Sequence, residues 1–113
     1  AAARDFIRAE CTPDDPGFVS NVVLAEVAWI LSRGYGYPRA AIADAIERIM
    51  ETAQLQVESS TDVASALADY RLGPVGFTDC LIGHLNRTAD CSHTVTFDRK
   101  AAKLPGFQLL KGG

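Results

Sequence analysis

Long apolar runs and cysteine pairs are both missing from this sequence of 113 residues. No stretch approaches the roughly 18 consecutive apolar residues that a membrane helix requires. No basic start followed by an apolar run and a small-residue cleavage site marks a signal peptide. The three cysteines form no Cys-x-x-Cys pair, and their odd number suits neither a disulfide framework nor a zinc knuckle. We therefore expect a cytoplasmic protein with reduced cysteines and no membrane partner.

An excess of positive charge is also missing, because eleven basic side chains stand against fourteen acidic ones and give a net charge of −3. A nucleic-acid ligand could not be held by a global positive field and would need local basic clusters. Hydrophobic residues make up 48% and charged residues 22% of the chain, which is an ordinary globular composition. A chain of this length can bury one core, so we expect residues 1–113 to form a single domain.

Helix-forming and strand-forming segments alternate along the chain. Apolar spacings of three and four, with capping residues, glycine and proline at the ends, predict helices over residues 1–11, 21–33 and 39–53, a helix that ends at 72 after caps at 59–62, and a helix from 78 or 79 to about 89. Short apolar or β-branched runs predict strands at 17–20, 55–58, 93–97 and 107–110. Helices between strands act as crossover connections, so we expect an α/β fold, a three-layer α/β/α sandwich with a mostly parallel sheet.

The beginning of the chain does not suit such a sandwich. A parallel three-layer fold normally opens with a buried, nearly continuous apolar strand, whereas this sequence opens with a helix-forming segment and without an initiating methionine. We therefore expect the chain to be N-terminally truncated, with its opening strand missing. If that strand is central, as the family resemblance described below implies, its loss should leave unpaired strand edges and exposed apolar side chains, which favour aggregation or oligomers.

Glu26 occupies an unusual place for a charged residue. At 100° per residue it projects between Val22, Val23, Trp29 and Ile30, inside the apolar stripe of its expected helix. This pattern predicts a carboxylate that faces the core. An alternative is that Glu26 lies at the edge of the stripe and pairs with an arginine, since Glu is almost never fully buried without a partner.

Two aspartates lie at the ends of expected elements. Asp79 is in the first turn of a helix, and Asp98 directly follows a strand. Either could simply be a helix or turn cap. Together with Glu26, however, they could converge at the carboxyl edge of a parallel sheet, where ligands bind in open α/β folds. Three carboxylates there would repel each other unless a cation neutralised them, and oxygen ligands without His or Cys indicate Mg²⁺ or Mn²⁺.

Three short segments, spread over nearly the whole chain, carry a resemblance. They are Phe18-Val-Ser-Asn-Val-Val-Leu-Ala-Glu26, Phe77-Thr-Asp79-Cys-Leu-Ile and Thr96-Phe-Asp98-Arg-Lys. In order and spacing they resemble the PIN domain family, and within it the VapC-type toxin ribonucleases of toxin–antitoxin systems. The resemblance implies an α/β/α sandwich in which four acidic residues hold Mg²⁺ or Mn²⁺ and RNA is cut. It also implies an antitoxin protein and a homodimer as partners.

By motif match, Glu26, Asp79 and Asp98 take the second, third and fourth acidic positions of the family, and Thr96 takes the hydroxyl position before the last. The family's first acidic residue, which ends the opening strand, has no counterpart. Asp5 belongs to an expected helix, and Asp14 and Asp15 lie in a proline- and glycine-rich loop, so none of them replaces it. We therefore expect the fragment 1–113 alone to be inactive.

The expected chemistry is metal-assisted hydrolysis of phosphodiester bonds in RNA. Single-stranded RNA is the favoured substrate because it can bend into a groove. Basic side chains near the expected site could contact its phosphates, namely Arg71, Arg87, Arg99 and Lys100. His84 and His93 have no second ligand at metal spacing, so we interpret both as structural.

Two other functions remain open from the sequence. A non-catalytic interaction module could keep the same fold without binding metal. A phospho-acceptor receiver domain also binds Mg²⁺ at the carboxyl edge of a parallel sheet, but it needs adjacent acidic residues after its first strand and an acceptor aspartate after its third. Here the acidic residues fall at helix starts instead.

Overall fold

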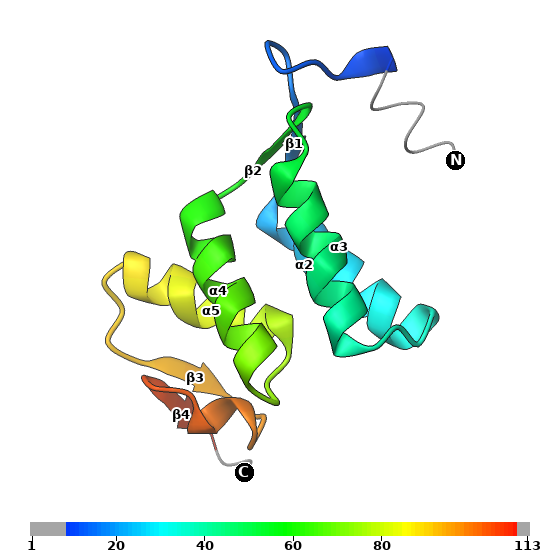
Figure 1. The fold of residues 1–113 in the computed structure, drawn as a ribbon. Helices are drawn as coiled ribbons and strands as arrows, with labels where there is room; N and C mark the ends of the chain where they lie inside the picture. Colours follow the sequence, from blue (N-terminus) through cyan, green and yellow to red (C-terminus); the bar gives the residue numbers. More distant parts are fainter. Residues whose placement is uncertain (1–8, 111–113) are drawn as a thin grey trace. The chain divides into compact units, whose positions relative to one another are not determined.

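The structure is a computed structural model that describes residues 9–110. Helices alternate with short parallel strands, which confirms the α/β class (Figure 1). The chain divides into two compact units, residues 1–60 and 61–113. Of the helix expected over residues 1–11, residues 1–8 lie outside the described residues, residues 9 and 10 are helical, and Cys11 is not. Among residues 9–110, no helix has the length and hydropathy needed to cross a membrane.

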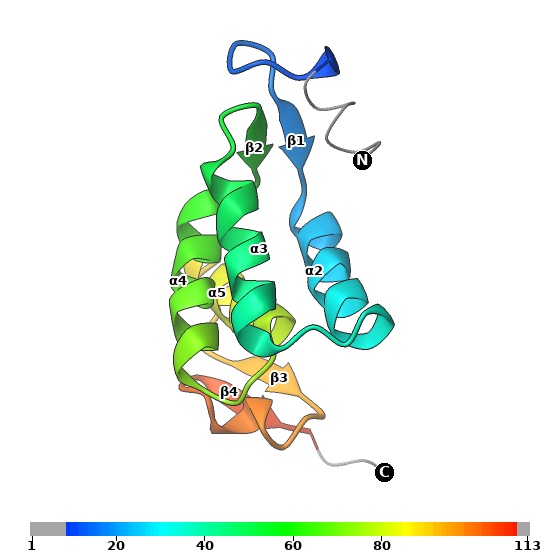
Figure 2. The same ribbon diagram turned by 45° about the vertical axis from the view of Figure 1, so that its right-hand side comes forward.

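The first unit is built around one pair of parallel strands. Strand β1 pairs with β2 in a register that places Gly17 opposite Leu55. The bounds are β1 (Gly17–Val19), α2 (Asn21–Trp29), the π-helical turn η1 (Ile30–Gly34), α3 (Arg39–Glu51) and β2 (Leu55–Val57). Figure 2 shows α2 and α3 side by side, on the crossover between the two strands. This connection confirms the expected parallel pairing.

Helix α2 begins where β1 ends, because two oxygen acceptors satisfy its first amides. The Ser20 hydroxyl accepts a hydrogen bond from the backbone N–H of Val23 at 3.2 Å, as expected of an N-cap. The Glu58 carboxylate, just beyond β2, accepts from the backbone N–H of Asn21 at 2.9 Å. At the other end, the N–H of Tyr35 reaches the carbonyl of Ile30 at 3.1 Å, and the wider π turn closes the helix.

Helix α3 has the amphipathic character that its apolar spacing predicts. Ile42 and Ile46 are buried together with Ala43, while the charged residues of the opposite face are exposed. The helix ends at Glu51, two residues before the expected end at 53. The buried residues of this unit also include Cys11, Leu24, Ala28 and Val57. The core of the first unit is therefore formed by aliphatic side chains of α2, α3 and β2.

The second unit also contains one parallel pair. Strand β3 pairs with β4, with Thr94 opposite Phe107. The bounds are α4 (Ser60–Leu72), α5 (Phe77–Thr88), β3 (Thr94–Thr96), the 3₁₀ turn η2 (Ala101–Lys103) and β4 (Phe107–Leu109). Figure 1 shows the pair below α4 and α5. The four strands of residues 9–110 thus form two sheets of two strands each.

The core of the second unit differs from expectation along α5. The apolar spacing of this helix predicts a face with Leu81, Ile82, Leu85 and Ala89; Leu81 is buried and Leu85 half-buried, but Ile82 and Ala89 are exposed, so the prediction is wrong for these two residues. The helix begins at Phe77, one residue earlier than predicted, and the residues three and four positions later, Cys80 and Leu81, are buried with it. The rings of Phe77 and Tyr70 pack edge to face with centroids 6.0 Å apart.

Glycine is required at one point of this core. A Cβ atom at position 83 would lie 2.5 Å from the Phe107 ring, well inside van der Waals contact. The missing side chain lets α5 approach β4 closely enough for that ring to pack on the helix backbone. This contact holds the β3–β4 pair against the helix that carries Asp79.

Substitution of two leucines in α4 tests which side of this helix belongs to the core. Leu67 is 6% exposed and Leu72 is 88% exposed. Leu67→Ala should lower the free energy of unfolding by about 2–5 kcal/mol, because it removes buried methyl groups and leaves a cavity. Leu72→Ala, the matched control in the same helix, should change it by less than about 0.5 kcal/mol. Urea denaturation followed by circular dichroism measures both, and equal effects would contradict this core.

Candidate functional site

Asp79 and Asp98 come together within the second unit. Asp79 is the third residue of α5 and is partly buried. Its pKa is raised above the ordinary value for Asp, first because burial disfavours the charged form and second because the Asp98 carboxylate repels it. A helix N-terminus alone would stabilise the anion and lower this pKa. Desolvation and like charge therefore outweigh the helix dipole at this position.

Asp98 is held by a local turn at the end of β3. Its Oδ1 atom accepts a hydrogen bond from the backbone N–H of Lys100 at 2.8 Å, and its own N–H donates to the Thr96 hydroxyl at 3.0 Å. Asp98 is exposed. The capping role considered from the sequence is thus present, and it uses one carboxylate oxygen while Thr96 fixes the backbone. Both residues therefore help to set the orientation of the Asp98 carboxylate.

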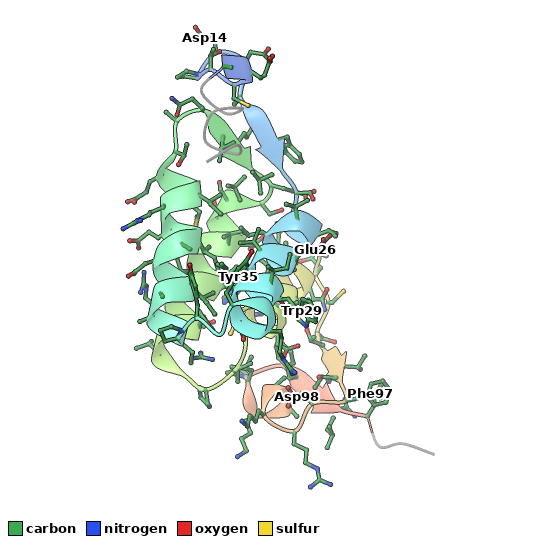
Figure 3. All side chains as sticks on the ribbon, turned by 90° about the vertical axis from the view of Figure 1, so that its right-hand side faces the viewer. Asp14, Glu26, Trp29, Tyr35, Phe97 and Asp98 are labelled. Carbon is green, nitrogen blue, oxygen red and sulfur yellow. The ribbon has the colours of Figure 1, made fainter. Side chains whose placement is uncertain are left out.

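Glu26 lies on α2 in the first unit and is exposed (Figure 3). The prediction that its carboxylate faces the core is wrong, because the buried residues of α2 are Leu24 and Ala28. The apolar neighbours of Glu26 are exposed as well, with Trp29 at 64% and Val22 at 68%. The helix is apolar on nearly all sides, so its sequence pattern could not show which side packs. The assignment of Glu26 to the metal site stays a prediction.

The fit of a divalent cation can be judged from the donors. Among residues 9–110, no group of three or more His, Cys, Asp or Glu side chains is arranged to hold a metal ion. Asp79 and Asp98 supply two carboxylates whose mutual repulsion a cation would relieve. Carboxylate oxygens suit Mg²⁺ or Mn²⁺ rather than zinc. The described part of the second unit therefore offers two ligands of the right chemistry.

Basic side chains follow Asp98 directly. Arg99 and Lys100 are exposed, and Lys103 lies in the 3₁₀ turn after them. Arg71 and Arg87 belong to the last turns of α4 and α5. Of the four basic residues predicted to contact substrate, Arg99 and Lys100 are the two that the backbone places next to a candidate ligand.

Arg87 lines a small cavity of about 130 Å³ at the end of α5. The other lining residues are Gly83, Cys91, Ser92, Thr94, Pro105 and Gly106. This cavity lies beside the pairing of β3 with β4, where the Thr94 N–H donates to the Gly106 carbonyl at 2.8 Å. It contains neither Asp79 nor Asp98. It is therefore separate from the paired carboxylates.

His84 has a partner that the sequence did not reveal. Its Nε2 atom lies 2.6 Å from Oδ2 of Asp69, so the pair joins α5 to α4, and Nδ1 lies 3.5 Å from the Arg87 guanidinium. His93 is exposed, with Nδ1 3.0 Å from the Ser92 hydroxyl. Asp69 was missed because it stands fifteen residues earlier on another helix. These contacts support the structural interpretation of His84.

The comparison with protein families decides among the possible folds. The PIN domain family matches residues 1–106. The chain belongs to the PIN domain family. Members of this family are generally metal-dependent nucleases, and this membership leaves no support for a receiver domain. The comparisons with curated proteins and with solved structures found no match for this PIN domain.

The coupling of the two aspartates can be measured directly. Asp98→Asn should lower the pKa of Asp79, because it removes the like charge, but that pKa should stay above 3.8, since burial is the larger cause. NMR titration of the Asp79 side-chain carboxyl carbon measures this shift. Asp90→Asn is the matched control and should leave the pKa of Asp79 unchanged. An unchanged value in Asp98→Asn would show that the two carboxylates do not interact.

The same shift has a defined sign for stability. A raised pKa means that the folded state binds the proton more tightly than the unfolded state does. The contribution of Asp79 to stability is therefore complete below the pKa of an unfolded Asp and is lost as the pH rises through the raised pKa. A divalent cation bound by Asp79 should reverse this loss near neutral pH.

Proposed function

We propose that this PIN domain is a metal-dependent endoribonuclease of the VapC type, the toxin component of a type II toxin–antitoxin system. The observation that carries the proposal is the pair of carboxylates, Asp79 and Asp98, at the start of α5 and the end of β3, with the pKa of Asp79 raised. Perturbed carboxylates of this kind cluster at functional sites. In a family of nucleases, such a pair is best explained as part of a metal site.

Asp79 and Asp98 would hold Mg²⁺ or Mn²⁺ in this proposal, and the resemblance adds Glu26 as a further ligand. When bound, the cation would activate water and stabilise the charge that develops on the phosphate. Thr96 acts through its hydrogen bond to the Asp98 N–H, which keeps the carboxylate-bearing turn in place. Arg99 and Lys100 would bind phosphates of the RNA and orient the chain. We assign three of the four acidic positions implied by the VapC resemblance to this sequence.

A protein partner is proposed for the first unit. Val22, Val23 and Trp29 are exposed on α2, Ile30 is exposed at the start of η1, and Phe18 is exposed on β1. Monomeric proteins rarely leave so many neighbouring large apolar side chains in water. The exposed apolar surface supports an antitoxin segment or a second copy of the chain as a binding partner. The same surface favours the alternative function, a non-catalytic interaction module with this fold.

Metal binding separates the nuclease from the interaction module. Asp79→Asn, Asp98→Asn and Glu26→Gln should each weaken Mn²⁺ binding at least about tenfold, because each removes a negatively charged oxygen ligand. Asp14→Asn is the matched control, since Asp14 is an exposed acidic residue of the loop before β1, and it should bind Mn²⁺ like the unmodified chain (Figure 3). Isothermal titration calorimetry measures all four variants.

Two results would contradict parts of this proposal. Equal Mn²⁺ affinity in Asp98→Asn and Asp14→Asn would remove the metal site and leave the interaction module. Normal Mn²⁺ affinity in Glu26→Gln, with loss in the two aspartate variants, would remove Glu26 alone from the site. Cleavage of single-stranded RNA that persists in excess EDTA would show that any nuclease activity does not depend on metal.

A further inference from the structure

The exposed face of the β3–β4 pair carries apolar side chains beside Gln108, which lies opposite Val95. Side chains alternate along β3, so that Thr94 is buried while Val95 is exposed, and Phe97 just beyond the strand is 74% exposed. Leu110 is exposed at the end of β4. An exposed aromatic ring of this size at the end of a strand is costly in water and useful for binding.

Phe97 stands directly between the strand and the carboxylate turn. Its Cα atom is one peptide unit, about 3.8 Å, from that of Asp98. Figure 3 shows the two side chains pointing to opposite sides of the chain at this point. Arg99 and Lys100 follow immediately and are exposed, and Lys103 is exposed in the next turn. One short segment therefore presents an aromatic face, a carboxylate and three cationic side chains.

We propose that Phe97 is a stacking platform for a base of single-stranded RNA, one residue before Asp98 and beside the cationic side chains that follow it. The inference rests on the proposed nuclease function and names how the substrate is positioned there. Every nucleobase has a π-face, so this contact holds a strand without selecting its sequence. Arg99 and Lys100 supply the positive charge that neighbouring phosphates need.

The charges around Phe97 favour a nucleic acid over an apolar protein segment. A helix or strand of another protein would bury Phe97, but it would also have to cover or neutralise the adjacent cations. A single-stranded polynucleotide can cover Phe97 and neutralise the adjacent cations at the same time. Its bases have flat, apolar faces, and its backbone is anionic. Phe97 is thus a positioning residue for substrate, and it takes no part in proton transfer or metal binding.

A series of substitutions at Phe97 separates stacking from simple apolar contact. The assay is fluorescence anisotropy of labelled single-stranded RNA with the 113-residue chain, at low salt and without metal, so that cleavage and metal affinity play no part. Phe97→Ala should bind about 5- to 150-fold more weakly, the range expected when a stacking aromatic is truncated. Phe97→Leu should lose nearly as much, whereas Phe97→Trp should bind at least as tightly as Phe97.

The matched control is Tyr35→Ala. Tyr35 is an aromatic residue, 69% exposed, that follows η1 in the first unit and has no role in the proposed site or the proposed partner surface. This variant should bind RNA like the unmodified chain. A second readout uses the double variant Trp29→Phe/Phe97→Trp, whose single tryptophan should be quenched by RNA but not by an abasic oligonucleotide with the same number of phosphates.

Each outcome has a defined meaning. Loss in Phe97→Ala and Phe97→Leu, with normal binding by Phe97→Trp and Tyr35→Ala, supports stacking. Equal RNA affinity in Phe97→Ala and the unmodified chain overturns the inference but leaves the nuclease proposal standing. Normal binding by Phe97→Leu, or a change of oligomeric state in Phe97→Ala on gel filtration, assigns the ring to a protein contact and overturns it too. If the unmodified chain binds no RNA, the inference and the proposed substrate both fail.

Discussion

The rest of the site depends on one constraint, the repulsion between two carboxylates in a partly desolvated environment. Asp79 is fixed by α5 and Asp98 by a turn anchored to Thr96 and Lys100, so neither can move away freely. Burial and like charge raise the pKa of Asp79 even though it lies at a helix N-terminus. A protein gains no stability from such an arrangement by itself. A cation bound by both carboxylates would remove their repulsion. This requirement links the fold of the second unit to the chemistry of the PIN family.

Local sequence signals predicted most of the secondary structure. Ser20 is the N-cap of α2, Gly73-Pro74 follows the end of α4, and the apolar spacing of α3 gives its buried face correctly. The two parallel pairings also agree with the expectation that helices act as crossovers. The helix ends and the buried face of α3 are determined by interactions between residues that lie close together in the sequence. That is why the sequence alone was sufficient for them.

Side-chain orientation was harder to predict, because it depends on what each helix packs against. The apolar residues of α2 surround the helix, so periodicity could not show that Leu24 and Ala28 are buried while Trp29 and Glu26 are exposed. On α5, Ile82 and Ala89 are apolar but exposed, which the spacing alone did not show. The His84–Asp69 pair joins two helices and has no local signature. For the site, the order and type of Asp79 and Asp98 were sufficient to suggest that they meet, whereas the orientation of Glu26 was not predictable.

The two short pairs of parallel strands determine how the molecule can unfold locally. Strand β1 bonds only to β2, and β3 only to β4, among the residues that the structure describes. Each ladder is therefore closed inside one unit, and its amides can become accessible without breaking the hydrogen bonds of the other. Cooperative opening of the second unit would release Asp79 and Asp98 together from their positions. An ion that ties these two carboxylates would accordingly slow amide exchange throughout β3 and β4.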